Sequence, residues 1–218
     1  MCVVVGNSEY AEMLMEYLEE SGVTVNAFCA DSGFIDNTVI NGRDVISTDE
    51  MLVKYPPSKT ILYLGIGYSK LGRIRKNLYF KMKSKGYRFG NYIHVSSVLH
   101  RGHQMGEGNV IFENVVIQRG TVLGNGNLVF SNGTIMHDNI IGNFNTFGAG
   151  SVSNGFVQIG DCNFVGSNAT LRDHISIGSD CLIGAGSYVD HNCENGDAVL
   201  PAKNSIYNGE ARKISEKL

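Results

Sequence analysis

Basic residues, long apolar stretches and proline are all scarce in this 218-residue chain. Eighteen lysines and arginines against 21 acidic residues give a net charge of −3, so no basic surplus indicates a nucleic-acid or membrane-surface partner. No apolar run approaches the ~20 residues of a membrane-spanning helix. The opening MCVVVGNSEY also lacks the charged start and long apolar core of a secretion signal. We therefore expect neither nucleic-acid binding nor membrane insertion.

Paired cysteines are missing as well. With no CxxC spacing and an odd number of thiols, the chain is expected to keep its cysteines reduced in the cytoplasm. Proline occurs only 3 times against 27 glycines. A disordered chain tends to be rich in both, so the glycines are expected to mark ordered tight turns. The cysteines are Cys2, Cys29, Cys162, Cys181 and Cys193.

The first part of the chain alternates between strand-like and helix-like segments. Short apolar runs at 1–7, 23–31 and 60–67 predict strands. The segments 8–22 and 69–86 carry apolar residues at helical spacing and end at glycine, which predicts two helices. The stripes that we expect to be buried are Tyr10, Leu14, Tyr17 and Leu18 on the first helix, and Leu71, Ile74, Leu78 and Met82 on the second.

This alternation predicts a small Rossmann-like βαβ domain around a parallel sheet, which we assign to residues 1–90. In such sheets the ligand site lies beyond the carboxyl ends of the strands. Those ends carry the candidate ligand-binding residues Gly6, Asn7, Ser8, Asp31, Gly65 and Gly67.

A different pattern begins at residue 91, where apolar residues recur every six positions without an insertion. An α-helix cannot bury this period, because its ~3.6 residues per turn would spread the anchors around its surface. Short strands joined by tight corners can bury it. Only one member of the series, a serine, is not apolar. The series is Ile93, Leu99, Met105, Ile111, Ile117, Leu123, Val129, Ile135, Ile141, Phe147, Ser153, Ile159, Val165, Leu171, Ile177, Ile183 and Val189.

The six-residue period is typical of a parallel β-helix of hexapeptide repeats. Helices of this kind are left-handed and close one triangular coil with three repeats, which makes about 18 residues per coil. Roughly five to six coils, each stacked about 4.8 Å above the last, fit into residues 91–192. The remaining residues 193–218 are expected to cap the end of the β-helix.

The segment IMHDNIIGNFNTFGAG (135–150) contains a His–Asp pair inside this scaffold. At about 18 residues per coil, His137 lies one coil below Gly155 and one coil above Arg119. A neutral imidazole can accept a proton there, and a glycine N–H one strand spacing away can stabilise an oxyanion, so the pair provides the minimum parts of an acyl-transfer site. The alternative is that His137 is ordinary solvated surface and that Asp138 is a common corner residue.

The histidines do not assemble a metal site within one chain. His137 and His191 share a column but lie three coils apart, about 14 Å at strand spacing, which is too far for one metal ion. His100 and His103 lie near the first coil, remote from His137. We therefore expect no metal, and ligands shared across a subunit boundary remain an alternative.

Together these motifs resemble a known family. The chain opens with VVVGNSEYAEMLMEYL and continues through AFCADSGFIDNTVINGRDVIS and LGIGYSKLGRIRKNLYFKMKSKGYRFGNYIHVSSVL to the hexapeptide repeats, HDNIIGNF and a late PAK. This order is similar to that of bacterial sugar O-/N-acyltransferases of the sialic acid O-acetyltransferase type, which include acetyltransferases of nucleotide-linked 4-amino sugars. The resemblance covers essentially the whole chain and implies a homotrimer that uses acetyl-CoA as acyl donor.

The resemblance also implies a role for each candidate residue. His137 would be the general base that takes a proton from the sugar amine or hydroxyl as it attacks the thioester, and Asp138 would orient it. Gly155 would direct its N–H at the thioester carbonyl. The strand-end residues of the first domain would hold the sugar nucleotide. The implied cofactor contacts are Thr146, Gly155, Gly184 and Ala185.

Some residues depart from the family pattern. Thr146 stands where a second histidine is frequent, Phe130 stands where an asparagine is frequent, and the opening GNSEYAE replaces a Gly-x-x-Gly-His loop. The leading hypothesis is acetyl transfer to the amino group of a nucleotide-linked amino-deoxy sugar in lipopolysaccharide or O-antigen biosynthesis. The alternatives are O-acetylation of sialic acid or a related sugar, and a catalytically silent scaffold that binds a sugar nucleotide.

Overall fold

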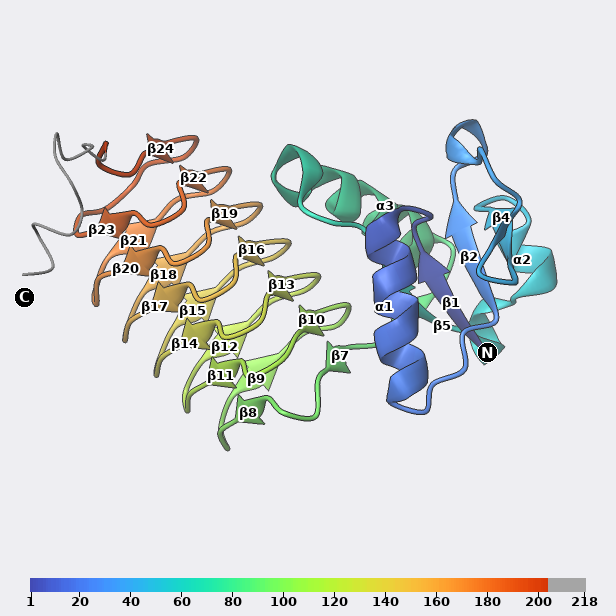
Figure 1. The fold of residues 1–218 in the computed structure, drawn as a ribbon, viewed down its shortest axis with the longest axis horizontal. Coiled ribbons are helices and arrows are strands. Elements are labelled where there is room, and N and C mark those ends of the chain that lie inside the picture. The colour runs from blue at the N-terminus through green and yellow to red at the C-terminus, as the bar shows by residue number, and fades with distance from the viewer. Residues whose placement is uncertain (204–218) are drawn as a thin grey trace, which may run out of the picture.

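The computed structural model describes residues 1–203, which fold into an α/β domain followed by a long β-helix (Figure 1). The α/β domain is built on a six-stranded sheet, sheet A, with the order β3-β4-β2-β1-β5-β6. Neighbouring strands pair in parallel except for β3 and β4. The strands are β1 (Cys2–Val5), β2 (Ala27–Ala30), β3 (Val39–Ile40), β4 (Arg43–Ser47), β5 (Ile61–Leu64) and β6 (Arg88–Phe89). The helices are α1 (Glu9–Glu20), α2 (Met51–Lys54) and α3 (Arg73–Ser84), with 3₁₀ turns at Ser32–Phe34, Pro57–Lys59 and Ser69–Gly72.

The strands and helices predicted in the first domain appear in their expected places. All four residues of β1 are buried, because a central strand of a parallel sheet is covered on both faces. Tyr10 and Tyr17 of α1 are half-buried and pack with residues of the β-helix. The stripe that α1 buries fully is Ala11, Leu14, Met15 and Leu18.

Helix α3 buries a different face from the one that its apolar residues predict. Arg75, Tyr79 and Met82 are buried, whereas Ile74 is 37% exposed and Leu78 is half-buried. The expected stripe is therefore confirmed at Met82, holds in part at Leu78, which packs against the core of the first domain, and is wrong at Ile74. The physical cause is that this face of α3 meets backbone carbonyl oxygens of the β-helix, which an arginine can bind and an aliphatic side chain cannot.

The β-helix consists of three parallel sheets that form the sides of a triangular prism (Figure 1). Each strand pairs with the strand one coil further on, as in the register Val110↔Leu128, so one coil is 18 residues long, as predicted. Sheet B contains β7 (Tyr92–Ile93), β10 (Val110–Ile111), β13 (Leu128–Val129), β16 (Thr146–Phe147), β19 (Phe164–Val165), β22 (Leu182–Ile183) and β24 (Ala198–Val199). Sheet C contains β8 (Val98–Leu99), β11 (Val116–Ile117), β14 (Thr134–Ile135), β17 (Val152–Ser153), β20 (Thr170–Leu171) and β23 (Tyr188–Val189). Sheet D contains β9 (Gln104–Met105), β12 (Val122–Leu123), β15 (Ile140–Ile141), β18 (Gln158–Ile159) and β21 (Ser176–Ile177).

The six-residue series fills the interior of the prism. Every anchor from Ile111 to Val189 is buried. Ser153, the polar exception, is fully buried and donates its hydroxyl to Asn139 Oδ1 at 2.7 Å, so its polar atom is satisfied. A buried asparagine ladder runs beside this core, and each Oδ1 accepts the backbone N–H one coil above. The ladder consists of Asn109, Asn127, Asn145 and Asn163.

The last coil is shorter than the others. Leu182 pairs with Ala198 rather than with a residue 18 positions on, and a bridge joins Ile177 to Cys193. Strand β24 thus adds one more strand to sheet B within the segment 193–218. Residues 204–218 lie outside the described residues, so the expectation that this segment caps the β-helix stays a prediction.

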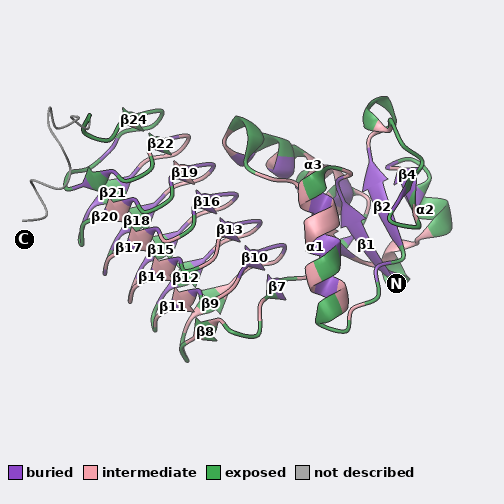
Figure 2. Ribbon diagram, viewed as in Figure 1, coloured by how far each residue is buried: buried purple, intermediate pink, exposed green. Residues whose placement is uncertain are grey.

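The two domains meet along sheet B, whose side toward the α/β domain is largely buried (Figures 1 and 2). Phe112 and Phe130 stack at 5.2 Å between ring centroids, and Tyr10 packs edge-on against both. Phe130, the departure from the family pattern, is thus part of this aromatic cluster. It contributes to the packing of the two domains.

Arg75 of α3 is the polar centre of this interface. It is completely buried, and its guanidinium donates hydrogen bonds to oxygens from both domains. Burial lowers the pKa of Arg75 to about 10, which leaves it charged at neutral pH. The acceptors are Gly126 O (2.7 Å), Gly67 O (2.8 Å), Phe144 O (2.8 Å), Asn145 O (3.1 Å), Thr146 Oγ1 (3.1 Å) and Ile66 O (3.3 Å).

Two further features bear on the sequence predictions. The five cysteines are all buried and free, as their odd number and spacing predicted. Within residues 1–203, no helix has the length and apolar content that crossing a bilayer requires.

Candidate active site

His137 lies at the corner between β14 of sheet C and β15 of sheet D. Its Nδ1 is 2.9 Å from Asp138 Oδ2, and both side chains are a little over one third exposed. Asp138 has a left-handed backbone (φ 56°), which turns its carboxylate back toward the preceding ring. A carboxylate at Nδ1 favours the tautomer with its proton on Nδ1, so Nε2 is the nitrogen left to accept a proton.

Gly155 lies directly above the His137 ring. The Phe156 N–H donates to His137 O at 3.1 Å, so the two corners are stacked. A Cβ at Gly155 would lie 2.7 Å from Cε1 and 2.9 Å from Nε2 of His137. Because φ of Gly155 is not in the left-handed region, space for the ring, and not backbone conformation, requires glycine here.

The Gly155 N–H is available to a ligand. Among residues 1–203 it has no hydrogen-bond partner, unlike the N–H groups of Asn154 and Phe156 on either side. The side-chain-free backbone of Gly155 thus lies against the His137 ring. An imidazole nitrogen can accept a proton and a free backbone N–H can bind an oxyanion, so the corner contains groups of the kind that acyl transfer uses.

Two other His–Asp pairs on the β-helix lack this environment. His174 with Asp173 (2.8 Å) and His191 with Asp190 (2.9 Å) have histidine side chains that are 66% and 67% exposed. The hydrogen bond from each histidine lowers the pKa of its aspartate. An exposed pair of this kind provides an internal comparison for the His137 corner.

An aromatic side chain connects two of these histidines. Phe156 packs edge-on against the His137 ring at 5.1 Å and stacks on His174 at 4.7 Å between centroids. Phe156 is 46% exposed, so about half of this residue is open to solvent. It was not among the residues predicted from the sequence, although its place one residue after Gly155 was a usable signal.

The remaining expected cofactor residues do not join His137 within one chain. Thr146 is buried in sheet B, and its hydroxyl accepts a hydrogen bond from Arg75. Its side chain is not available to a bound molecule, so we remove Thr146 from the site. Gly184 and Ala185 lie at the corner between β22 and β23, which is a different edge of the prism from the His137 corner.

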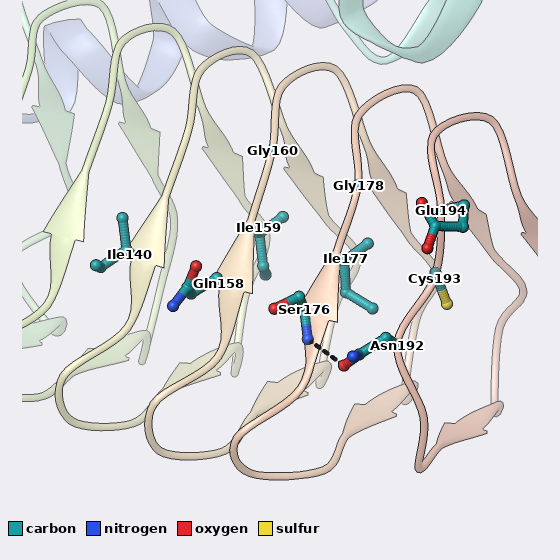
Figure 3. A pocket seen from close by; sticks show the side chains of 10 residues that line it. All are labelled: Ile140, Gln158, Ile159, Gly160, Ser176, Ile177, Gly178, Asn192, Cys193 and Glu194. Atoms are coloured by element: carbon teal, nitrogen blue, oxygen red, sulfur yellow. Dashed lines mark hydrogen bonds between the residues drawn. The ribbon is translucent and has the colours of Figure 1, made fainter.

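A hollow lies on the outer face of sheet D, and its first lining residue, Ile140, is three residues after His137 (Figure 3). It has a volume of about 400 Å³ and extends upward across β15, β18 and β21. Ile140, Gln158 and Ser176 face outward in it. Asn192 lines its far end, where its Oδ1 accepts the Ser176 N–H at 2.8 Å. The hollow is open and mixed in polarity.

A second cavity, of about 350 Å³, lies at the carboxyl ends of the strands of sheet A. Of the residues predicted at this edge, Gly6, Asn7 and Asp31 line it. Ser8, Gly65 and Gly67 do not line it. Ser8 begins α1, Gly65 is buried against Val4 and Ala11, and the Gly67 carbonyl is bound by Arg75. The other lining residues are Ala30, Phe34, Ile66, Ile74, Asn77, Leu78 and Lys81.

Asp31 carries the charge in this cavity. It accepts hydrogen bonds from Lys81 Nζ at 2.6 Å and Thr48 Oγ1 at 2.8 Å. Burial by itself raises its pKa, but these two hydrogen bonds and the charges of Lys81 and Lys85 together outweigh burial, so the pKa of Asp31 is lowered. The wall of the cavity formed by Ile74 and Leu78 was not predicted, because the helical spacing of those residues assigned them to the core.

No metal site accompanies these cavities. Among residues 1–203, no three histidine, cysteine, aspartate or glutamate side chains come together as metal ligands.

Known proteins share this architecture. Residues 156–191 match the bacterial transferase hexapeptide family (six repeats). No curated protein matches the sequence significantly. A histidine-to-alanine variant of GDP-perosamine N-acetyl transferase from Caulobacter crescentus, in complex with CoA and GDP-perosamine, has a TM-score of 0.83 at 23% identity, covering 91% of this chain and 92% of that chain.

Two further solved structures have the same fold. The acetyltransferase domain of PglB from Neisseria gonorrhoeae FA1090, in complex with acetyl coenzyme A, has a TM-score of 0.81 at 24% identity and covers 94% of this chain and 98% of that chain. WeeI from Acinetobacter baumannii AYE has a TM-score of 0.76 at 20% identity and covers 92% and 96%. These findings confirm the predicted fold, a Rossmann-like domain followed by a left-handed β-helix of hexapeptide repeats.

Proposed function

We propose that the chain transfers an acetyl group from acetyl-CoA to the amino group of a nucleotide-linked amino-deoxy sugar. One observation carries this proposal: the His137 ring, bonded to Asp138 through Nδ1, lies with Nε2 against the side-chain-free Gly155. The solved structures with this fold add support, since one is a complex with CoA and GDP-perosamine and another a complex with acetyl coenzyme A.

The chemistry follows from the atoms at this corner. The sugar amine attacks the thioester carbonyl while Nε2 of His137 takes the proton from the nitrogen. Asp138 stabilises the imidazolium that forms, and the Gly155 N–H binds the oxyanion of the tetrahedral intermediate. Collapse of the intermediate breaks the C–S bond, and the leaving thiolate of CoA takes the proton back from His137. The amide product and free thiol leave the histidine neutral for the next turnover.

The cavity at sheet A suits the nucleotide part of the acceptor. It combines an apolar wall from Ile74 and Leu78 with Asp31, Lys81 and the exposed ring of Phe34, which are groups suited to a base and its polar edge. Within one chain this cavity and His137 lie on different sides of sheet B. We therefore propose a homotrimer in which adjacent chains complete the site, with the thioester arm in the sheet D hollow.

The two residues that depart from the family pattern do not favour a catalytically silent scaffold. Phe130 and Thr146 pack in the domain interface, away from His137 in the same chain. Neither substitution changes the His137 corner. O-acetylation uses the same corner, and only the acceptor separates it from N-acetylation. We place the reaction in the cytoplasm, in the assembly of lipopolysaccharide or O-antigen.

A thiol-release assay tests the proposal. The protein is mixed with acetyl-CoA and GDP-, UDP- or dTDP-linked 4-amino sugars, or with sialic acid, and free thiol is measured along with the mass of the product. We expect thiol release with an amino-sugar nucleotide and an acetamide product. Release only with hydroxyl acceptors would establish O-acetylation. Tight nucleotide binding without thiol from any acceptor would establish the scaffold.

Replacing Gly155 with alanine is expected to lower turnover by at least about tenfold while the protein stays folded, because displacement of a catalytic group by less than 1 Å has effects of this size. The new Cβ would contact the His137 ring, which must move. The control is the same substitution in a His137→Ala background, where the ring is gone. We expect no loss of thermal stability from Gly155→Ala in that background and some loss in the wild type. Equal stability effects in both backgrounds would contradict this contact.

A further inference from the structure

A third hollow lies immediately below His137 on the same edge of the prism. It has a volume of about 250 Å³ and is lined by His100, Gln118, Arg119 and His137. These residues follow β8, β11 and β14, so three successive coils contribute to it. The Asp138 N–H donates to Arg119 O at 3.0 Å, which fixes the corner of Arg119 directly beneath that of His137.

Arg119 gives this hollow a positively charged side chain. Arg119 is exposed, and within residues 1–203 its side chain has no ion pair or hydrogen bond. The carboxylate of Asp138, one coil above, is bonded to His137. His100 and Gln118 add side-chain groups that can donate hydrogen bonds. A guanidinium with two further donors around a concave surface is suited to an oxyanion such as a phosphate or a carboxylate.

The Arg119 hollow lies on lower coils of the β-helix than the sheet D hollow. The sheet D hollow is lined by residues of β15, β18 and β21, whereas the Arg119 hollow is lined by residues that follow β8, β11 and β14. A donor and an acceptor can therefore approach His137 from opposite directions along one edge. The acceptor would then come from the β8 end of this edge.

We infer that the Arg119 hollow binds an anionic group of the acceptor and so holds the nucleophile beside His137. This inference rests on the proposed function. Arg119 provides the charge, and His100 and Gln118 provide further hydrogen bonds to the same group. The anion has two chemical sources, the diphosphate of a sugar nucleotide or the carboxylate of an acidic sugar. Both sources present negatively charged oxygens to the same side chains, so the experiment must distinguish a diphosphate from a carboxylate.

Steady-state kinetics of Arg119→Ala test the inference. We expect KM for the acceptor to rise about tenfold or more, with KM for acetyl-CoA unchanged, because one charge-assisted contact is lost on the acceptor side only. Arg119→Lys should restore part of the affinity, since it keeps the charge but loses the planar fork. Arg101→Ala is the matched control: Arg101 lies one coil below Arg119 and does not line the hollow, so it should keep the wild-type KM.

The acceptors identify the anion. If the diphosphate binds here, Arg119→Ala weakens a sugar nucleotide but not the same sugar without phosphate. If a carboxylate binds here, the variant weakens an acidic sugar but not its neutral counterpart. Wild-type KM for every acceptor in Arg119→Ala, with an active wild-type enzyme, would overturn the inference.

A binding measurement separates this failure from failure of the proposed function. Inorganic pyrophosphate and acetate are titrated into wild type and Arg119→Ala, and the ring signals of His100 and His137 are followed by NMR. We expect the wild type to bind one of these anions about tenfold more tightly than the variant, whether or not any acceptor is turned over. Equal binding by the two proteins would overturn the inference even for an inactive chain.

Discussion

Replacing His137 with alanine is expected to lower kcat by a factor on the order of 10² or more, with a modest change in KM. The imidazole is the group at the Gly155 corner that can take the proton of the attacking amine. Alanine leaves the Gly155 N–H and the cavity at sheet A unchanged, because His137 does not line that cavity. The loss should therefore appear in turnover and not in binding. Thiol release from acetyl-CoA, followed at several acceptor concentrations, measures both constants.

The matched control is His174→Ala. His174 also pairs with a neighbouring aspartate and also contacts Phe156, but it is 66% exposed and has no glycine against its ring. We expect His174→Ala to keep kcat within about threefold of the wild type, since it removes a solvated pair without touching the reacting atoms. Near-wild-type turnover in His137→Ala, or an equal loss in His174→Ala, would contradict the assignment of the base.

The β-helix could be predicted from the sequence because its geometry is local and repetitive. An anchor every six residues fixes the coil length, and the coil length fixes which residues stack, so the stacking of Gly155 on His137 follows from the sequence alone. Ser153 does not break the pattern, since Asn139 satisfies its hydroxyl inside the core. The shortened last coil, in which Ala198 pairs with Leu182, has no comparable signal because the repeat has already ended there.

The contact between the two domains could not be predicted in the same way. Patterns of apolar residues assume that a buried helix face is apolar, and α3 violates this assumption by burying Arg75. The same assumption hid the cavity at sheet A, because Ile74 and Leu78 were assigned to the core. Thr146 was placed in the cofactor site on a family resemblance, yet its hydroxyl is bound by Arg75. These errors have one origin, since each involves a contact between residues that are distant in the sequence.

Arg75 is therefore the residue whose replacement should most destabilise the fold. Arg75→Met keeps much of the side-chain volume but leaves the carbonyl oxygens of Gly126 and Phe144 buried without a donor. Buried ion pairs can often be replaced by apolar residues because both charges leave together, but here the acceptors belong to the backbone and remain. Since each unsatisfied acceptor costs about 1–3 kcal/mol, we expect the free energy of unfolding to fall by about 3 kcal/mol or more.

Urea unfolding of the wild type and of two variants on the same helix measures this effect. Arg73→Met removes an arginine that is exposed and pairs with Asp180 at 2.9 Å, so it controls for helix propensity and loss of charge. Exposed ion pairs contribute little, because water screens them. The midpoint of unfolding should fall strongly for Arg75→Met and very little for Arg73→Met. Similar midpoints for the two variants would mean that the domains are held together by the aromatic cluster of Tyr10, Phe112 and Phe130, with Arg75 a minor contributor.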